Sequence, residues 1–206
     1  HQADLIYSPC QTETQALACL RRLGLLRVPL VCLAHHPLDQ GRLSWLRRPW
    51  VRSAVIGVNR YPSLSRKVAE EINRAAGGTH SEVIPWGPDK NYYEIARGPG
   101  TGAVAAGRTG RDFDTFGAAA TEAGTAARII CLCQDVPRNA GSFGAHVVVE
   151  SHPADRPVGY RALTRAFAAA RVLAIPLHAQ DTLAGLTSLM DALGVGRPVI
   201  VTRNPL

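Results

Sequence analysis

Short apolar runs rich in β-branched residues alternate with segments of helical periodicity along the whole chain. This alternation is typical of an α/β protein with parallel sheets. The pattern predicts strands at Leu5–Tyr7, Pro29–Ala34, Ala54–Val58, Glu82–Trp86, Gly102–Ala106, Arg128–Leu132, Ala145–Val149, Val172–Ile175 and Pro198–Thr202. It predicts helices near Thr12–Leu25, Arg42–Trp50, Ser63–Ala76, Phe113–Ala123, Tyr160–Ala169 and Leu186–Leu193.

The segment Ala96–Gly102 holds three glycines and a proline, which marks it as the best candidate for a linker. We therefore predict two Rossmann-like domains, residues 1–96 and residues 97–206. Ligands of such sheets bind beyond the carboxyl ends of the strands. The chain opens without Met, almost directly on a predicted strand, and stops just after one. We expect both domains to be incomplete.

The net charge of +7 arises from 23 basic and 16 acidic side chains. This balance suits phosphate-bearing ligands, nucleic acid or an anionic membrane surface alike. With 6% aromatic residues and no basic run interleaved with stacking rings, a nucleic-acid platform is disfavoured. No apolar run approaches the roughly 20 residues that span a bilayer. The five cysteines stand in apolar segments, so we expect reduced, buried thiols in a cytoplasmic protein. Cys131 and Cys133 are predicted to face one side of a strand.

The stretch DTLAGLTSLMDALGVGRPVIVT places a glycine turn directly before a short helix. Gly185 lets a ligand approach the backbone, and the N–H groups near Leu186, Thr187 and Ser188 can donate to phosphate oxygens. Asp191 shares the helix face of the two hydroxyl residues and can bind hydroxyl groups of a ribose. The stretch therefore favours a nucleoside diphosphate site. The alternative is a helix whose hydroxyl residues only cap its N-terminus.

The same stretch resembles the donor-binding signature of GT-B glycosyltransferases, above all the large retaining family four (glycosyl transferases group 1). Asp191-Ala192-Leu193 occupies the family's Glu-Ala-Met slot, and Gly196-Arg197-Pro198 occupies its Gly-Lys-Pro slot. Eight residues before this acid, where the family usually has a second Glu, the chain has Leu183. The segments VIPWGPDKNYY and AVAAGRTGRDFDTFGAAA also resemble the family, so the likeness covers most of the chain.

Arg108 and Arg111 follow a predicted strand, beside Gly107 and Gly110. A leaving diphosphate gains negative charge during sugar transfer, and fixed guanidinium groups stabilise that charge. The resemblance implies that both arginines serve this role; the alternative is a solvated arginine pair on a loop. The resemblance also implies that His35 faces the donor sugar from the acceptor half, with His36 as a substitute. A packed or exposed histidine is the alternative.

Other side chains carry weaker signals. Asn59 and the segment Pro176-Leu177-His178 follow predicted strands, so we consider them as further site positions. Asp112 and Asp114 are expected to be acids at a helix N-terminus rather than metal ligands, and no catalytic metal is expected. Trp45, Arg47, Arg48 and Trp50 form a basic aromatic helical segment, which suits either a Trp-anchored core helix or contact with an anionic membrane.

Together these features lead to the hypothesis of a glycosyltransferase of GT-B architecture. It would move a sugar from a nucleotide diphosphate donor, as substrate and without a further cofactor, to an unknown acceptor. The resemblance implies retention of configuration and independence of metal. The alternatives are a nucleotide-sugar epimerase of the same fold and a non-catalytic nucleotide-sugar-binding fragment.

Overall fold

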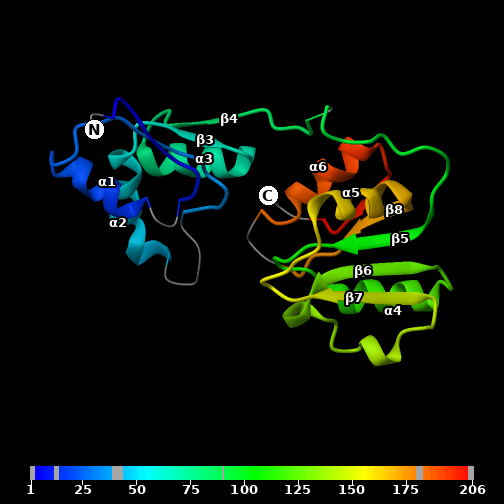
Figure 1. Cartoon of the computed structure of the whole chain (residues 1–206). Helices are drawn as coiled ribbons and strands as arrows, with labels where there is room; N and C mark the ends of the chain where they lie inside the picture. Colours follow the sequence, from blue (N-terminus) through cyan, green and yellow to red (C-terminus); the bar gives the residue numbers. More distant parts are fainter. Residues whose placement is uncertain (1–2, 12–13, 39–43, 90, 180–182, 204–206) are drawn as a thin grey trace. The chain divides into compact units, whose positions relative to one another are not determined.

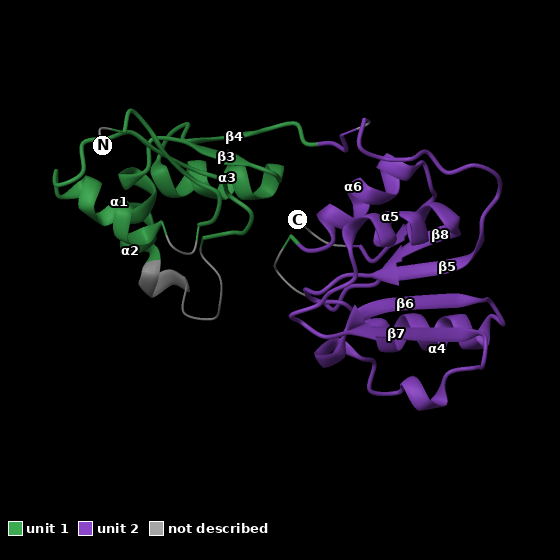
Figure 2. Cartoon of the chain, viewed as in Figure 1, with its two compact units in different colours: residues 1–86, 181–183, 204–206 green, residues 87–180, 184–203 purple. Residues whose placement is uncertain are grey.

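The computed structural model describes residues 3–11, 14–38, 44–89, 91–179 and 183–203, apart from the side chains of residues 44–47. We call these the described residues. They form an α/β chain in which every pairing between named strands is parallel, as the sequence predicts (Figure 1). The chain divides into unit 1, residues 1–86 with 181–183 and 204–206, and unit 2, residues 87–180 and 184–203 (Figure 2).

Unit 1 is built from short parallel strands and helices that enclose one apolar core. Strand β1 pairs with β2, strand β3 pairs with β4, and single bridges from Val31 to Arg60 and from Ala34 to Ser63 join the two pairs. The core includes Leu30, Val55 and Ile72, whose side chains are almost completely buried. The elements of unit 1 are β1 (Ile6–Ser8), α1 (Gln15–Arg22), β2 (Leu30–Cys32), α2 (Ser44–Gly57), β3 (Tyr61–Ser63), α3 (Arg66–Ala76) and β4 (Ser81–Val83).

One predicted strand of unit 1 is wrong. Residues 54–57 form the end of α2, Val58 follows the helix directly, and the strand of this region is β3 instead. Val51, Val55 and Val58 recur at helical spacing, and both Val55, within α2, and Val58, just after it, are buried in the core. A short apolar run occurs both in buried strands and at the ends of buried helices. The pattern alone therefore does not distinguish the two at this place.

Unit 2 is a five-stranded parallel sheet in the order β7-β6-β5-β8-β9. Figure 1 shows these strands side by side with their helices. Side chains alternate between two core clusters: Val104 and Ala106 pack with α5 and α6, whereas Ala105 packs with α4. The elements are β5 (Thr101–Ala106), α4 (Phe113–Glu122), β6 (Ala127–Leu132), η1 (Cys133–Asp135), η2 (Ala140–Ser142), β7 (Val147–His152), α5 (Tyr160–Ala169), β8 (Ala170–Ile175), α6 (Leu186–Val195) and β9 (Val199–Val201).

The contacts divide the chain after Trp86, earlier than the predicted boundary between residues 96 and 97. The reason is that the segment before the glycine run packs on α6. The ring of Tyr93 lies so close to Gly194 that a Cβ added there would stand 2.5 Å from it, and Ala96 N–H donates to the Val195 carbonyl at 2.9 Å. The linker segment thus groups with the second sheet.

Arg197, the arginine of the Gly-Arg-Pro turn, binds the same linker at Gly98. Arg197 is only 8% exposed, and its Nη1 donates to the Gly98 carbonyl at 2.8 Å. Its Nε and Nη2 donate to the Ala168 carbonyl at 3.0 and 2.6 Å. The guanidinium therefore ties the linker, the end of α5 and the start of β9 together through main-chain atoms.

The expectation of buried cysteines holds for only part of the set. Cys32 and Cys131 are buried and Cys19 is half-buried, whereas Cys10 and Cys133 are exposed. Strand β6 ends at Leu132, and Cys133 begins a turn of 3-10 helix. The alternation that would have put Cys131 and Cys133 on one face stops before the second thiol.

Candidate functional site

The order of the strands in unit 2 locates its site. The central strand β5 lies between β6 and β8. The chain crosses from β5 to β6 through α4 and from β7 to β8 through α5, and these two helices pack on opposite faces of the sheet. Ligands of open parallel sheets bind beyond the carboxyl ends of the strands at this reversal. Two loops meet there, the one that follows β5 and the one that follows β8. Asp112 N–H donates to the Pro176 carbonyl and His178 N–H to the Gly110 carbonyl, so the loops are joined along their backbones.

Arg111 links the first loop to helix α6. Its Nε donates to the Ala106 carbonyl at 3.1 Å, its Nη1 to the Thr109 carbonyl at 2.9 Å, and its Nη2 to Ser188 Oγ at 3.0 Å. Burial lowers the pKa of the guanidinium. Its partners among the described residues are carbonyl and hydroxyl oxygens, so a full positive charge stands at the first turn of α6. Together with the helix dipole, it favours an anion at this place.

Two glycines allow this arrangement. Gly107 has φ +138°, and a Cβ there would lie 2.4 Å from Arg111 Nε. Gly185 precedes α6 with φ +84°, and its Cβ would lie 2.6 Å from Ile175 Cγ2 and 3.8 Å from Arg111 Nη1. Both positions exclude a side chain. The bare backbone of Gly185 therefore lies beside the guanidinium and the first N–H groups of the helix, which have no acceptor within the helix.

Asp191 is engaged in a way that the sequence analysis missed. The residue is 5% exposed, and its Oδ1 accepts hydrogen bonds from Tyr93 Oη at 2.7 Å and from Tyr160 Oη. The two phenol oxygens lie 3.0 Å apart. Burial, followed by the hydrogen bond to Asp191, raises the pKa of Tyr160. Burial also raises the pKa of Tyr93. Tyr93 is 98 positions away in the sequence, and no local pattern announces this contact.

The remaining residues that the sequence predicts for donor binding lie in the loop that follows β5 and at the start of α6. Leu186 and Thr187 open α6, the first half-buried and the second exposed, and Ser188 is buried against Arg111. Arg108 follows Gly107 in the same loop and is exposed. Among the described residues no hydrogen bond or ion pair ties its side chain to the site, so the structure brings Arg111 to α6 but leaves Arg108 on the loop surface.

His35 lies in unit 1 at the carboxyl end of β2. Its Nε2 is 2.8 Å from the Pro9 carbonyl, and Gln11 Oε1 accepts from its backbone N–H and from that of His36. Gln11 Nε2 donates to the His36 carbonyl, so the loop after β1 holds the loop after β2. Burial, followed by the charge of His35, lowers the pKa of His36. The unit therefore presents two histidines at the carboxyl edge of its strands.

Two acids expected at a helix start are placed as predicted. Asp112 caps α4, with Oδ1 accepting from Thr115 N–H at 3.1 Å and Oδ2 from Thr115 Oγ1 at 2.7 Å. Burial works to raise the pKa of Asp112, but the bonds from Thr115 and the charge of His178, whose Nδ1 is 3.8 Å away, outweigh it and hold the pKa below its usual value. Asp114 lies in the first turn of the same helix.

The structure gives Asn59 and Trp50 surroundings that differ from those expected from the sequence. Asn59 Oδ1 accepts from Leu30 N–H at 2.9 Å, which places the side chain at the amino end of β2, so a role at the carboxyl edge is wrong. Trp50 is 68% exposed and is not a core anchor. The side chains of Trp45 and Arg47 lie outside the described residues.

The described residues contain neither a metal-binding cluster nor a membrane-spanning helix. No cluster of three or more His, Cys, Asp or Glu side chains is placed to hold a metal ion. Of the helices in this part of the chain, none has the length and apolar character needed to cross a membrane.

No known family model and no curated protein sequence matches this chain. Solved structures do. HepE from Anabaena, crystallised with UDP and glucose, matches 98% of the chain with a TM-score of 0.65 at 19% identity. A variant of TarM from S. aureus, crystallised with fondaparinux, alpha-GlcNAc-glycerol and UDP, matches 87% with a TM-score of 0.59 at 9% identity. A GtfA/B complex matches 100% with a TM-score of 0.62 at 14% identity.

These matches cover 59%, 38% and 43% of the three known chains, so this chain spans less than two thirds of the length of each. At these identities the likeness concerns the fold. The chain has the GT-B fold, an α/β architecture with parallel sheets.

Proposed function

We propose that the chain is part of a retaining, metal-independent glycosyltransferase that uses a nucleoside diphosphate sugar as donor. Unit 2 is the donor-binding unit, and the observation that carries the proposal is the position of Arg111. A guanidinium held against Ser188, beside the bare backbone of Gly185 and the start of α6, is suited to a diphosphate. Two of the structures that share the fold contain UDP, which supports a UDP-sugar as the donor.

The chemistry of this proposal rests on fixed charge. As the bond between the sugar and the diphosphate breaks, negative charge grows on the leaving phosphate. Arg111 stabilises that charge in place, and Arg108, on the same loop, can close onto the distal phosphate. Both tyrosines bind Oδ1 of Asp191, so Oδ2 is the oxygen that would accept from a ribose hydroxyl. His35 is proposed to bind a hydroxyl group of the donor sugar from unit 1.

Calorimetric titration with UDP, GDP and TDP tests the donor site, and release of UDP from UDP-glucose or UDP-GlcNAc tests turnover. We expect one nucleotide to bind and Arg111→Ala to weaken it. Absence of binding by all three, or binding that Arg111→Ala leaves unchanged, rejects the proposed site. Binding without turnover in the presence of candidate acceptors favours a non-catalytic nucleotide-binding fragment.

A further inference from the structure

Three tyrosines of unit 2 gather beside Asp191. Tyr93 Oη, at 2.7 Å, and Tyr160 Oη both donate to Asp191 Oδ1, so the two phenols reach the second turn of α6. The ring centroid of Tyr92 lies 5.3 Å from that of Tyr93, edge to face, and 5.4 Å from that of Tyr160. Both separations fall in the range of roughly 4.5–7 Å that favours aromatic pairs. The three residues therefore form one group, which we call the tyrosine cluster.

The tyrosine cluster has a packed inner ring and two outer rings. A Cβ added to Gly194 would lie 2.5 Å from Tyr93 Cδ2, so the ring of Tyr93 packs directly on α6. Tyr92 and Tyr160 are each 46% exposed. Contacts with Tyr93 and Asp191 thus position the two outer rings, while much of their surface remains open to a ligand.

The second carboxylate oxygen of Asp191 is open as well. The hydrogen bonds that Asp191 accepts from the tyrosines are both at Oδ1. Of the described residues, only His80 has a side-chain nitrogen or oxygen that is buried without a partner, so Oδ2 of Asp191 is reached by solvent. A hydroxyl group bound to Oδ2 would therefore share one carboxylate with the phenol of Tyr160.

These groups follow one another along α6 in the order of the parts of a nucleoside diphosphate. Gly185, Ser188 and Asp191 are three positions apart, so they share one face of the helix. Arg111, which binds Ser188, stands where the diphosphate is proposed to lie, and Asp191 stands where the ribose is proposed to lie. The tyrosine cluster is bonded to Asp191, so it lies next to the ribose. In such a ligand, that is the position of the base.

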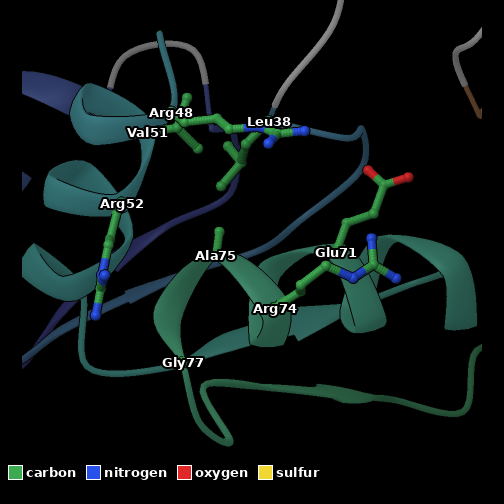
Figure 3. Close-up of a pocket in the computed structure, with 8 residues that line it drawn as sticks. All are labelled: Leu38, Arg48, Val51, Arg52, Glu71, Arg74, Ala75 and Gly77. Atoms are coloured by element: carbon green, nitrogen blue, oxygen red, sulfur yellow. The ribbon is translucent and has the colours of Figure 1, made fainter. Parts of the chain in front are cut away.

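The cavity of unit 1 has no comparable surface. It has a volume of about 520 Å³ and lies between α2, α3 and the segment that follows β2 (Figure 3). Figure 3 shows Arg52 extending toward Gly77 along this cavity. None of the described residues that line it is aromatic. A planar base would therefore find no ring to stack on there, whereas unit 2 offers Tyr92 and Tyr160.

We propose that Tyr92 and Tyr160 form the stacking surface for the base of the donor nucleotide. This assignment rests on the proposed donor site, because a ribose held by Asp191 is what brings the base to the two rings. Every base has a π-face, so stacking on aromatic side chains tolerates different bases. The tyrosine cluster therefore adds affinity for nucleoside diphosphates in general, and the choice among bases depends on other groups.

Calorimetric titration with UDP and with inorganic pyrophosphate separates the base from the diphosphate. We expect Tyr92→Leu and Tyr160→Leu each to weaken UDP binding roughly fivefold or more, as loss of a stacking ring does. Pyrophosphate binding should stay unchanged, because pyrophosphate has no base. Tyr92→Phe keeps the ring and should restore UDP affinity. Tyr7→Leu is the matched control, because Tyr7 is a 55% exposed tyrosine of β1 in unit 1, and it should leave UDP affinity unchanged.

Proton NMR of UDP adds a readout that a change in folding does not mimic. A base stacked on a phenol ring lies in the ring current, so H5 and H6 of the uracil should shift upfield on binding. The shift should be smaller with Tyr92→Leu than with the unmodified chain. UDP affinity that neither leucine variant reduces overturns the proposal, and so do base-proton shifts that Tyr92→Leu leaves unchanged. An equal loss of UDP and pyrophosphate binding also overturns it, because the rings would then support the fold rather than the base.

Arg111→Ala distinguishes failure of the stacking surface from failure of the donor site. This variant should weaken both UDP and pyrophosphate binding. If it does so while the leucine variants bind UDP normally, the donor site stands and the stacking surface is rejected. If UDP, GDP and TDP all fail to bind the unmodified chain, the donor site is rejected, and the stacking surface with it.

Discussion

Nη2 of Arg111 lies 3.0 Å from Oγ of Ser188 and donates a hydrogen bond to it. The two residues are 77 positions apart, one on the loop after β5 and the other in the first turn of α6. Their contact holds a half-buried positive charge where the N-terminus of the helix already favours an anion. Because the proposed donor site depends on this charge, the first predictions concern these two side chains.

Arg111→Ala should weaken UDP binding about 10- to 100-fold, since hydrogen bonds to a charged group contribute roughly 1.5–3 kcal/mol. Calorimetric titration measures the change. Arg161→Ala, which removes an exposed arginine of α5, is the matched control and should bind UDP as the unmodified chain does. Equal affinity in the two variants would show that Arg111 does not contact the nucleotide.

Ser188→Ala should weaken UDP binding by less than Arg111→Ala, because the guanidinium remains but loses the hydroxyl that orients it. A neutral hydrogen bond contributes about 0.5–1.5 kcal/mol. The double variant should show less than the sum of the two single effects, because contacting residues couple. Strict additivity of the calorimetric free energies would mean that Ser188 does not act through Arg111.

Gly185→Ala should lower both stability and UDP affinity. The residue has φ +84°, and the new Cβ would stand 2.6 Å from Ile175 Cγ2. The left-handed backbone alone costs about 1 kcal/mol for an L-residue. Gly124→Ala separates the two causes, because Gly124 has φ +59° and nothing within 4 Å of the added Cβ. The free energy of unfolding in urea should be lower for Gly185→Ala than for Gly124→Ala. The reverse order would contradict the predicted clash between the new Cβ and Ile175.

Because Tyr93 and Tyr160 bind Asp191, the free energy of unfolding should decrease as the pH rises into the alkaline range. The pKa of Tyr160 and that of Tyr93 are raised in the folded chain, chiefly by burial. The unfolded chain releases these protons near pH 10, whereas the folded chain retains them. Their contribution is complete below about pH 10 and is lost as the pH rises further. Urea unfolding between pH 8 and 11 should show this loss.

Tyr160→Phe provides the control for that pH dependence. It keeps the ring but removes the hydroxyl that donates to Asp191, so the alkaline loss of stability should become smaller. Phenolate absorbance of the folded chain should also lose part of its late-titrating signal. An identical pH profile in this variant would mean that the Tyr160 proton is not held by the fold.

The sequence predicted unit 2 better than unit 1, and the reason is the length of the elements. Helix α5 begins and ends where its periodicity predicts, and α4 and α6 differ only at their ends. Unit 1 has strands of three residues, too short for an alternating pattern. The apolar run Ala54–Val58 therefore predicts a strand, although its burial follows the helical spacing of α2.

The sequence predicted the grouping of candidate site residues only in those parts that are encoded locally. A glycine turn, a helix start and an arginine after a strand are all local features, and Gly185, Ser188 and Arg111 lie together in the structure. The partners of Asp191 are not local. Tyr93 and Tyr160 reach it from a linker and from another helix, and only the packing of the sheet shows which side chains meet there.

The three main-chain bonds of Arg197 change how the Gly-Arg-Pro turn is understood. A guanidinium has N–H groups in several directions, so one side chain can bind the Ala168 and Gly98 carbonyls at once. The compact ammonium of a lysine would have to choose between these two distant acceptors. In this chain, the basic residue of the turn is therefore an internal brace of unit 2, and its presence in a sequence reports architecture rather than ligand specificity.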